Sequence, residues 1–213
     1  MPTYSKKTDI LSGTPARDGG RETTNRRAEK TILPEKLTIN FSKNPPARYI
    51  SNDDYSRNFI EYFMKERPAG KPFCFWLGFK EPHRPYEDGA GERGGKDLKS
   101  VEIPKYYPDH RIVRSDLADY AYECEHMDSH VKKVLDYLES VGELDNTLVV
   151  YTSDHGMPFP RVKGQIYEHG YNVPMAVRWG KNIKKPRVEN TFINVRDFAP
   201  TFLELAGVEN TGR

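Results

Sequence analysis

The sequence predicts an α/β fold in which a layered sheet is flanked by helices. Residues 72–79 form a continuous apolar run bounded by lysines, which is the pattern of a strand covered on both faces. Residues 115–141 carry one apolar stripe at helical spacing. Two further strand patterns, at 147–151 and 173–179, precede an apolar helix pattern at 195–206. Strands that alternate with helices along a chain indicate an α/β layered architecture.

Length and charge restrict the function classes before any motif is considered. The chain has 213 residues, with 33 Lys and Arg against 31 Asp and Glu, so its formal net charge is +2 with mixed signs. That balance argues against a strongly basic nucleic-acid binder. The sequence has no run of about 18 apolar residues, so no membrane span is expected. The first residues also lack the apolar stretch of a secretory signal.

Composition and periodicity divide the chain into two segments. Residues 1–50 are polar and rich in turn signals, such as Gly13-Thr14-Pro15 and Pro45-Pro46, and we expect an irregular, loop-rich segment there. Residues 51–213 carry the periodic patterns and are expected to form the ordered part. A loop-rich opening of this length is unusual at the start of a compact domain, so it indicates the interior of a larger fold.

The first helix is predicted to begin near residue 51, because Ser51-Asn52-Asp53-Asp54 offers side chains that can cap it. Pro68 and Gly70 end it. Between these signals, apolar residues recur at helical spacing. They are Phe59, Ile60, Phe63 and Met64.

The strand at 72–79 is followed by a proline-stiffened loop at 81–86 and by a long loop, rich in glycine and charge, at 87–112. The helix at 115–141 comes next and ends at Gly142. Its apolar positions recur at alternating spacings of three and four residues, so they form one face that we expect to pack against the core. They are Leu117, Tyr120, Cys124, Met127, Val131, Val134, Leu138 and Val141.

The last predicted elements are a buried strand at 147–151, a second strand at 173–179 and the helix at 195–206. Gly207 is placed to end that helix. Its inward residues are expected to be Phe198, Phe202, Leu203 and Leu205.

The two cysteines, Cys74 and Cys124, both lie in apolar patterns. Neither has a partner at metal-ligand spacing, and two thiols do not make a disulfide framework. We therefore expect both to be buried as small hydrophobic residues.

The residues with distinctive chemistry follow two of the predicted strands, where open α/β sheets bind ligands. Lys80, Glu81 and His83 follow the strand at 72–79, and Asp154-His155-Gly156 follows the strand at 147–151. A carboxylate beside an imidazole is half of a plausible metal site. The next loop adds Arg161, Lys163, Tyr167, Glu168 and His169.

Each of these signals has an ordinary structural interpretation when it is taken alone. An Asp-His-Gly turn is more often a capping arrangement, and a histidine between prolines is more often a residue of a surface loop. A single lysine is most often simply solvated. Their combination is more specific than any one of them.

Four stretches together resemble the C-terminal part of the sulfatase catalytic domain, within the alkaline-phosphatase-like superfamily. They are KPFCFWLGF followed by PHRP at 71–85, DNTLVVYTSDHG at 145–156, KGQIYEHG followed by VP at 163–174, and DFAPTFLELAG at 197–207. They occur in the family's order, and the resemblance covers roughly residues 50–210. The segment MPFPR at 157–161 is most similar to the heparan N-sulfatase group and its bacterial glycan-sulfatase relatives.

The resemblance implies roles for four residues. Asp154 and His155 match two protein ligands of a divalent cation, usually calcium, although calcium prefers oxygen to imidazole nitrogen. Lys163 matches a lysine that contacts the sulfate group. His83 matches a histidine that contacts the sulfate or protonates the leaving oxygen. Together these groups would stabilise the negative charge that grows as a sulfate ester is cleaved.

The sequence also departs from the family pattern. No Cys or Ser lies in the C/S-x-P-S-R motif that becomes the formylglycine nucleophile, and the family's Asp-Asp metal pair is missing. Both belong to the family's N-terminal part. Residues 51–213 are therefore expected to be the C-terminal portion of an incomplete catalytic domain that lacks roughly its first 100 residues. We expect this chain alone not to hydrolyse sulfate esters, and the missing N-terminal part to be a partner.

Three functions remain open at this stage. The first is a sulfuric ester or sulfamate hydrolase that acts on sulfated carbohydrate. The second is a phosphodiesterase or phosphonate hydrolase of the same superfamily, against which the element at 163–174 argues. The third is a non-catalytic remnant that only binds. The family that the sequence resembles is usually extracytoplasmic.

Overall fold

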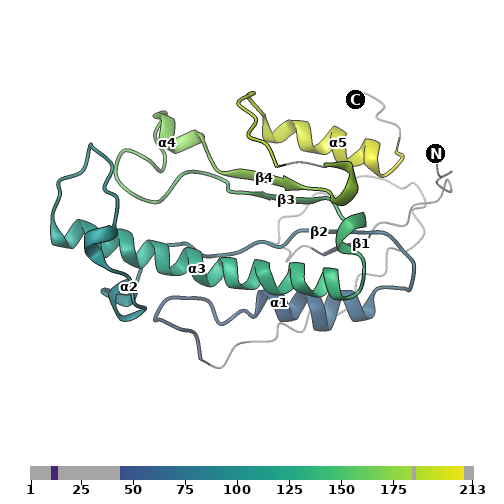
Figure 1. Ribbon diagram of the computed structural model, residues 1–213, viewed down its shortest axis with the longest axis horizontal. Coiled ribbons are helices and arrows are strands. Elements are labelled where there is room, and N and C mark those ends of the chain that lie inside the picture. Colours follow the sequence, from purple (N-terminus) through teal and green to yellow (C-terminus); the bar gives the residue numbers. More distant parts are fainter. Residues whose placement is uncertain (1–10, 14–43, 184–185, 209–213) are drawn as a thin grey trace, which may run out of the picture. The chain divides into compact units, whose positions relative to one another are not determined.

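The computed structural model describes residues 11–13, 44–183 and 186–208, which fall into two compact units. One unit contains residues 11–13, 63–76 and 186–208, and the other contains residues 44–62 and 77–183. Figure 1 labels the helices and strands of both. Most of the loop-rich segment predicted at 1–50 lies outside the described residues, and the domain boundary at residue 50 stays a prediction.

The first unit has a small parallel sheet and a terminal helix. Strand β1 (Leu11–Gly13) pairs with β2 (Phe73–Phe75), with Leu11 opposite Phe73 and Gly13 opposite Phe75. The 3₁₀ turn η5 (Val195–Asp197) leads into helix α5 (Phe198–Leu205). Asn194 begins this segment with a reciprocal capping box that also involves the Asp197 side chain.

The prediction that residues 72–79 form a strand covered on both faces is wrong. Strand β2 has only three residues, and exposure alternates along it, with Cys74 exposed between two half-buried phenylalanines. The Phe63 ring lies 4.5 Å from the Phe75 ring and covers one face. On the other face, Cys74 is not the buried residue expected, and the following Trp76 is 69% exposed. Cys124 is half-buried.

Helix α5 is confirmed, but its predicted burial is wrong. No residue of α5 is buried, and Phe202, Leu203 and Leu205 are 37–44% exposed. The rings of Phe198 and Phe202 stack on each other at 5.8 Å. The helix contacts mainly η5, which is too small to cover an apolar face.

The predicted helix that begins near residue 51 consists of helix α1 (Tyr55–Arg57) and the π-helical turn η1 (Asn58–Met64). Asp54 caps α1, because its side chain accepts a hydrogen bond from the Arg57 backbone N–H. Phe59 and Met64 are buried, as the periodicity predicts.

The second unit is organised around the 30-residue helix α3 (Arg111–Ser140). Leu117, Val134 and Leu138 are its buried apolar residues from the predicted stripe, while Val141 lies just beyond the helix and is exposed. The helix also buries a second set of positions that the apolar pattern did not predict. They are Ala118, Asp119, Glu123 and His130.

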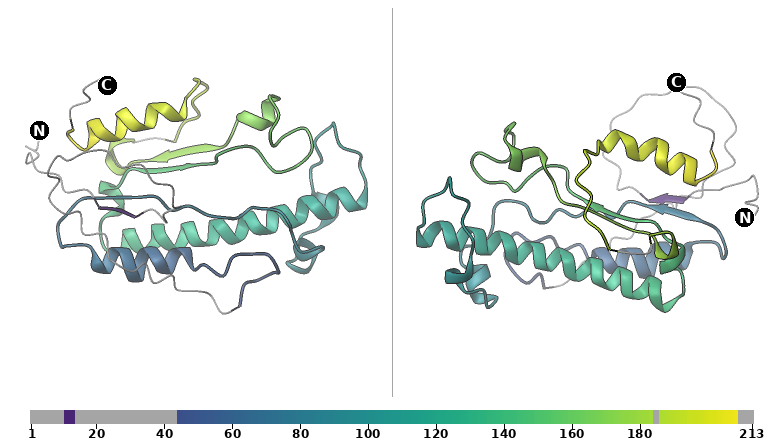
Figure 2. Two further views of the ribbon diagram at one scale, coloured as in Figure 1. Left: turned by 180° about the vertical axis from the view of Figure 1, so that it is seen from behind. Right: turned by 45° about the horizontal axis from the view of Figure 1, so that its top comes forward.

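Part of the predicted loop at 87–112 is ordered into helix α2 (Ala90–Arg93) and the 3₁₀ turn η2 (Leu98–Ser100). Helix α2 lies against the N-terminal part of α3 (Figures 1 and 2). A Cβ atom at Gly91 would lie 2.4 Å from the Ala118 carbonyl oxygen, so this close approach requires glycine. Asp119 accepts hydrogen bonds from the N–H groups of Gly89 and Gly91, at 3.0 and 2.8 Å.

Strands β3 (Val149–Thr152) and β4 (Met175–Arg178) form an antiparallel pair, with Val149 opposite Arg178 and Thr152 opposite Met175. Short turns precede and follow them, η3 (Leu144–Asn146) and η4 (Gly180–Asn182). Helix α4 (Glu168–Tyr171) lies in the connection between the two strands. Both predicted strands are confirmed, but the prediction that the strand at 147–151 is buried is wrong, because every residue of β3 is only half-buried.

Candidate active site

The loop that carries His83 is anchored by a buried carboxylate. The Glu81 side chain accepts a hydrogen bond from the Ser51 backbone N–H at 2.5 Å and another from the Tyr55 hydroxyl at 2.7 Å. Burial, together with the hydrogen bond to Glu81, raises the pKa of the Tyr55 phenol, so this group stays a donor. The Tyr55 oxygen also accepts from the Lys80 backbone N–H at 3.1 Å. These contacts fix the chain immediately before His83.

His83 is held through its backbone and through one ring nitrogen. Its N–H donates to Oε2 of Glu123 at 2.9 Å, and its Nδ1 lies 2.6 Å from the Arg84 carbonyl oxygen. A carbonyl oxygen can only accept, so Nδ1 carries the proton of that hydrogen bond. The exposed side chain therefore presents Nε2 to the surroundings, where it can give or receive a proton.

Glu123 is a buried carboxylate directly beneath this loop. Burial raises its pKa to about 7, the carboxylates of Glu81 and Asp119 act in the same direction, and the His83 N–H opposes them. No motif in the sequence singled out Glu123. The signal was a second stripe on the helix, at 119, 123, 126 and 130, whose members are all titratable and recur at helical spacing.

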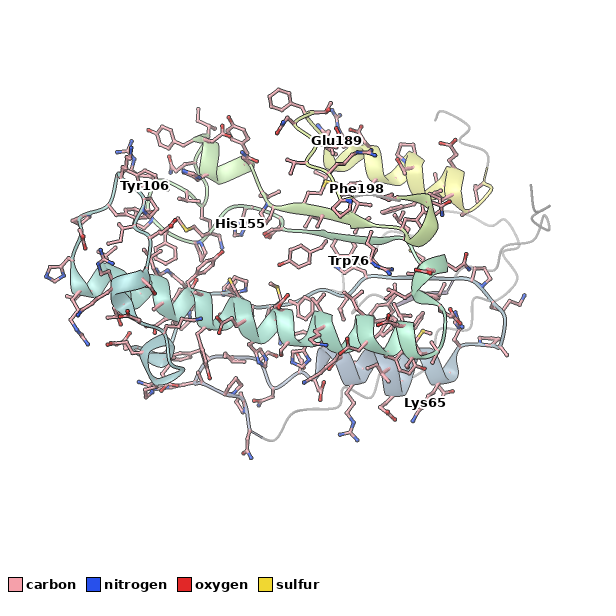
Figure 3. All side chains as sticks on the ribbon, viewed as in Figure 1. Lys65, Trp76, Tyr106, His155, Glu189 and Phe198 are labelled. Carbon is pink, nitrogen blue, oxygen red and sulfur yellow. The ribbon has the colours of Figure 1, made fainter. Side chains whose placement is uncertain are left out.

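The Asp154–His155 pair follows β3, and its two side chains lie next to each other. The Nδ1 atom of His155 lies 2.7 Å from the Gly156 carbonyl oxygen, so this nitrogen carries the proton. The lone pair of Nε2 is then free, and Nε2 lies 3.5 Å from Oδ2 of Asp154. The Ser153 hydroxyl donates to the His155 carbonyl at 2.8 Å and steadies the turn. Figure 3 labels His155 at this position.

This donor set fits part of a cation site. One carboxylate oxygen and one imidazole nitrogen can bind a divalent metal as two ligands of a larger set. The Asp154 side chain is 85% exposed, so it is free to take up a ligand. Within residues 11–13, 44–183 and 186–208, no group of three or more His, Cys, Asp or Glu side chains is arranged to hold a metal.

The loop after the pair closes on itself. The Gly156 N–H donates to the Gly170 carbonyl at 3.1 Å, and a Cβ atom at Gly156 would lie 1.8 Å from the His169 carbonyl oxygen. Only glycine fits there. Val162 is completely buried inside the loop, and the next residue, Lys163, is exposed. The loop therefore holds Asp154 and His155 at its base and presents Lys163 from a fixed backbone.

Arg84 joins the His83 loop to the Lys163 loop. Its Nε–H donates to the Pro158 carbonyl at 2.8 Å, and its guanidinium lies 4.6 Å from the centre of the Phe159 ring. A salt bridge of 2.6 Å to Asp116 holds the same guanidinium on α3. Phe159 is buried with Tyr86 and Leu117. The structure thus fixes the two predicted loops to each other, while it records no direct bond between their candidate side chains in the described residues.

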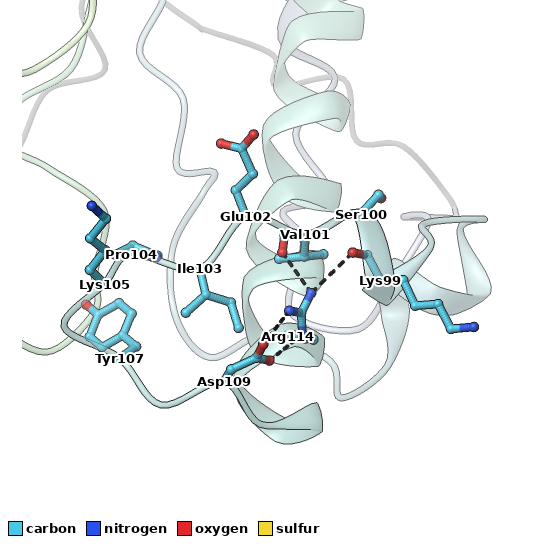
Figure 4. Close-up of a pocket in the computed structure, with 10 residues that line it drawn as sticks. All are labelled: Lys99, Ser100, Val101, Glu102, Ile103, Pro104, Lys105, Tyr107, Asp109 and Arg114. Carbon is cyan, nitrogen blue, oxygen red and sulfur yellow. Dashed lines mark hydrogen bonds and ion pairs between the residues drawn. The ribbon is translucent and has the colours of Figure 1, made fainter.

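A pocket of about 540 Å³ is lined by residues between Lys99 and Arg114 (Figure 4). None of the four predicted site residues lines it. Arg114 is its central cation, and its hydrogen bonds go to the Asp109 carboxylate and to the carbonyls of Leu98 and Val101. A guanidinium satisfied in this way has little capacity left for a ligand.

A second cluster surrounds His130 and superficially resembles a hydrolase triad. The Ser56 hydroxyl lies 2.9 Å from Nδ1 of His130, and Oδ1 of Asp54 lies 3.6 Å from the same nitrogen. In a catalytic triad the serine and the carboxylate contact opposite ring nitrogens. The Ser56 backbone N–H also donates to Nδ1, at 3.3 Å. This cluster is therefore a structural network that ties α1 to α3.

Comparison with known families decides the relationship. The model of the family described as Sulfatase matches residues 12–208. The chain belongs to the sulfatase family. The resemblance given by the four sequence stretches is therefore confirmed.

The curated relatives of this sulfatase include bacterial and human proteins. An ulvan-active sulfatase of Formosa agariphila is 38% identical over 65% of this chain and 24% of its own length. An N-acetylglucosamine-6-O-sulfatase of Bacteroides thetaiotaomicron is 36% identical over 56% of this chain and 20% of its own. Human N-sulphoglucosamine sulphohydrolase is 30% identical over 63% of this chain and 31% of its own length. The chain thus spans less than a third of the length of each.

Solved structures agree on the fold. A chain from work on the metabolism of multiple glycosaminoglycans by Bacteroides thetaiotaomicron superposes with a TM-score of 0.64 at 25% identity, over 74% of this chain and 36% of that one. A structure of BT4656 in complex with its substrate D-glucosamine-2-N,6-O-disulfate gives a TM-score of 0.55 at 24% identity. The match covers 73% of this chain and 48% of that one. The predicted α/β class, of the alkaline-phosphatase and sulfatase type, is confirmed. No described helix is long and apolar enough to span a membrane.

Proposed function

We propose that this sulfatase chain carries one side of the active site of a sulfuric ester or sulfamate hydrolase that acts on sulfated carbohydrate. The observation that supports this most strongly is the loop closed between Gly156 and Gly170, which holds Asp154 and His155 at its base and presents Lys163. Arg84 fixes the same loop to the one that carries His83. Cationic and proton-donating groups on two coupled loops suit the cleavage of an ester that builds negative charge.

Asp154 and His155 are the residues that would hold the divalent cation. Oδ2 of Asp154 and Nε2 of His155 are the atoms available for it. Calcium is the cation that the family resemblance implies, and the carboxylate suits it, whereas the imidazole suits zinc or iron better. When bound, the cation would supply positive charge next to the sulfate group. The remaining ligands would come from outside the described residues.

Lys163 and His83 are proposed to act on the sulfate ester itself. The Lys163 ammonium would donate hydrogen bonds to the sulfuryl oxygens and offset their charge. His83, whose Nδ1–H donates to the Arg84 carbonyl, would act as an imidazolium and pass the proton of Nε2 to the leaving oxygen. The S–O bond would break as a nucleophile from outside the described residues binds the sulfur. For a sulfamate, the same proton would go to the leaving nitrogen.

The names of the relatives support the substrate class. They are an ulvan-active sulfatase, an N-acetylglucosamine-6-O-sulfatase and an N-sulphoglucosamine sulphohydrolase. We therefore propose a sulfated saccharide as the ligand of this chain. The sequence carries no C/S-x-P-S-R motif, so we propose that the chain by itself binds such a saccharide without hydrolysing it.

Calorimetric titration of the chain with glucosamine 6-sulfate and with unsulfated glucosamine tests this proposal. The sulfated sugar is expected to bind more tightly, and Lys163→Ala is expected to weaken its binding about tenfold or more, the usual effect of losing a charged hydrogen bond. Lys99→Ala removes an exposed lysine of the 540 Å³ pocket and is expected to change nothing. Equal affinity for both sugars, or an unchanged Lys163→Ala variant, would refute the proposal.

Turnover is followed in the same samples by the release of sulfate. The proposal predicts no release by the chain alone. Metal-dependent release that Lys163→Ala abolishes would show that the chain is catalytically complete, contrary to the proposal.

A further inference from the structure

Arg161 lies two residues before Lys163 and has an unusual conformation. Its φ angle is 65°, in the left-handed region that disfavours residues with a side chain. Holding a non-glycine residue there costs roughly 1 kcal/mol. Glycine would adopt this conformation without that cost, as Gly164 does three residues later with a φ of 73°. The loop therefore retains a long cationic side chain at a position where its backbone is strained.

Two tyrosines hold the Arg161 side chain in place. The guanidinium carbon lies 5.8 Å from the centre of the Tyr106 ring and 5.3 Å from the centre of the Tyr167 ring. Each contact is a cation–π interaction that restricts the side chain without using its N–H donors. The Tyr107 hydroxyl also donates to the Pro160 carbonyl, which fixes the 106–107 segment against the residue before Arg161. Figure 3 labels Tyr106 at this edge of the second unit.

The positive charge of Arg161 is not used within the described part of the chain. The structure records cation–π contacts for its guanidinium, but no ion pair or hydrogen bond to a described residue. This differs from Arg84 and Arg114, which are paired with Asp116 and Asp109. The acidic neighbour on the loop, Glu168, accepts instead from Tyr171 and Asn172. Arg161 is thus a restrained, exposed cation whose N–H donors no described residue uses.

The position of Arg161 relative to Lys163 is set by the chain. The two residues flank Val162, which is completely buried, and both are exposed. Consecutive turns, from Val162 N–H to the Phe159 carbonyl and from Gln165 N–H to the Val162 carbonyl, fix this stretch at 3.2 and 3.1 Å. Two residues span at most about 7 Å of chain. A ligand held by Lys163 therefore lies within reach of the Arg161 side chain.

We infer that Arg161 forms a second anion subsite, which binds a further sulfate or a carboxylate of the saccharide whose reacting sulfate contacts Lys163. This inference rests on the proposed function. The planar guanidinium can hold either group through two parallel hydrogen bonds, which a lysine cannot do. The subsite selects saccharides that carry more than one anionic group over those that carry only the reacting sulfate.

Binding of three sugars to the 213-residue chain tests the subsite: glucosamine 6-sulfate, glucosamine 2-N,6-O-disulfate and a disaccharide that pairs a 6-sulfate with a uronate. The wild-type chain is expected to bind one or both doubly charged sugars about tenfold more tightly than the monosulfate, because each gains one charged contact. The sugar that gains identifies the second group as sulfate or carboxylate.

Substitution then assigns the preference to Arg161. Arg161→Gln keeps a side chain that can lie on the tyrosine rings but removes the charge, and it is expected to abolish the preference while retaining monosulfate affinity. Arg161→Lys is expected to keep only part of it. Arg48→Ala is the matched control, since Arg48 is another exposed arginine over a tyrosine ring, at 4.8 Å, and it should retain the full preference.

The outcomes separate this inference from the proposed function. If Lys163→Ala weakens the binding of every sulfated sugar but Arg161→Gln retains the preference for doubly charged sugars, the subsite is refuted and the proposed function stands. If the wild-type chain binds all three sugars equally, the subsite is also refuted. If the chain binds no sulfated sugar, both fail. If Arg161→Gln lowers the thermal stability and weakens the binding of all three sugars equally, Arg161 stabilises the loop and does not form a subsite.

Discussion

Replacing Glu123 by glutamine changes how the stability of the chain depends on pH. Glu123 is 3% exposed, and its pKa is raised from 4.5 to about 7. Below pH 4.5 the carboxyl is protonated in both the folded and the unfolded chain. Between pH 4.5 and about 7, Glu123 is ionised in the unfolded chain and protonated in the folded chain. The folded state therefore loses stability as the pH rises through this range, until Glu123 ionises in both states. Glutamine cannot ionise, and its amide oxygen can still accept the His83 N–H.

The magnitude follows from the two pKa values. Each pKa unit between 4.5 and about 7 corresponds to about 1.4 kcal/mol, so the wild type should lose up to about 3 kcal/mol relative to Glu123→Gln across this range. The quantity compared between the wild type and Glu123→Gln is the change of the free energy of unfolding with pH. A constant difference between the two side chains, such as a lost or gained hydrogen bond, therefore cancels.

Urea unfolding at a series of pH values from below 4.5 to above 7 measures this difference. Glu139→Gln is the matched control, because Glu139 lies on the same helix and is exposed. The control should follow the wild type at every pH. If Glu123→Gln follows the wild type as well, Glu123 has no raised pKa, and the account of the buried acid beneath His83 is refuted.

Three further experiments test other parts of the structure. Burial lowers the pKa of His130 below its usual 6.5, so the chain should lose stability as the pH falls below 6.5, and His130→Gln should lessen this loss in acid unfolding curves. Gly156→Ala should lower the melting temperature markedly because its Cβ would lie 1.8 Å from a carbonyl oxygen, whereas Gly164→Ala, at a position with open space, should cost only about 1 kcal/mol from its backbone angle. Arg84→Met should weaken the binding of glucosamine 6-sulfate although it leaves Lys163 intact, because the two loops lose their link; affinity equal to the wild type would contradict that coupling.

The helices and strands that sequence analysis predicted correctly are those with strong local patterns. The alternating three- and four-residue spacing on α3 and the apolar runs of β3 and β4 each describe one element without reference to any other. Burial was predicted less well, because it depends on what covers an apolar face. Trp76 and Leu205 satisfy apolar patterns, yet they are exposed in the described structure. The pattern specifies an apolar face and not its partner.

The candidate site shows the same division. The identities of Asp154, His155 and Lys163 could be read from the sequence through the family resemblance, because short motifs carry them. The bond from Arg84 to Pro158 spans 74 residues, so no local pattern could predict it. Glu123 was missed because a glutamate on a long helix is most often solvated. Only the tertiary structure shows that it is buried and holds the His83 backbone.

Nuclear magnetic resonance mapping of bound glucosamine 6-sulfate shows whether the two loops bind the sulfate group. The backbone amide shifts are expected to change most at residues 154–163 and at His83. Unsulfated glucosamine should leave these shifts unchanged, and Lys163→Ala should suppress the changes. Shift changes that centre on the pocket at 99–114, or equal changes with the unsulfated sugar, would contradict the claim that these two loops form the sulfate-binding side of a sulfatase active site.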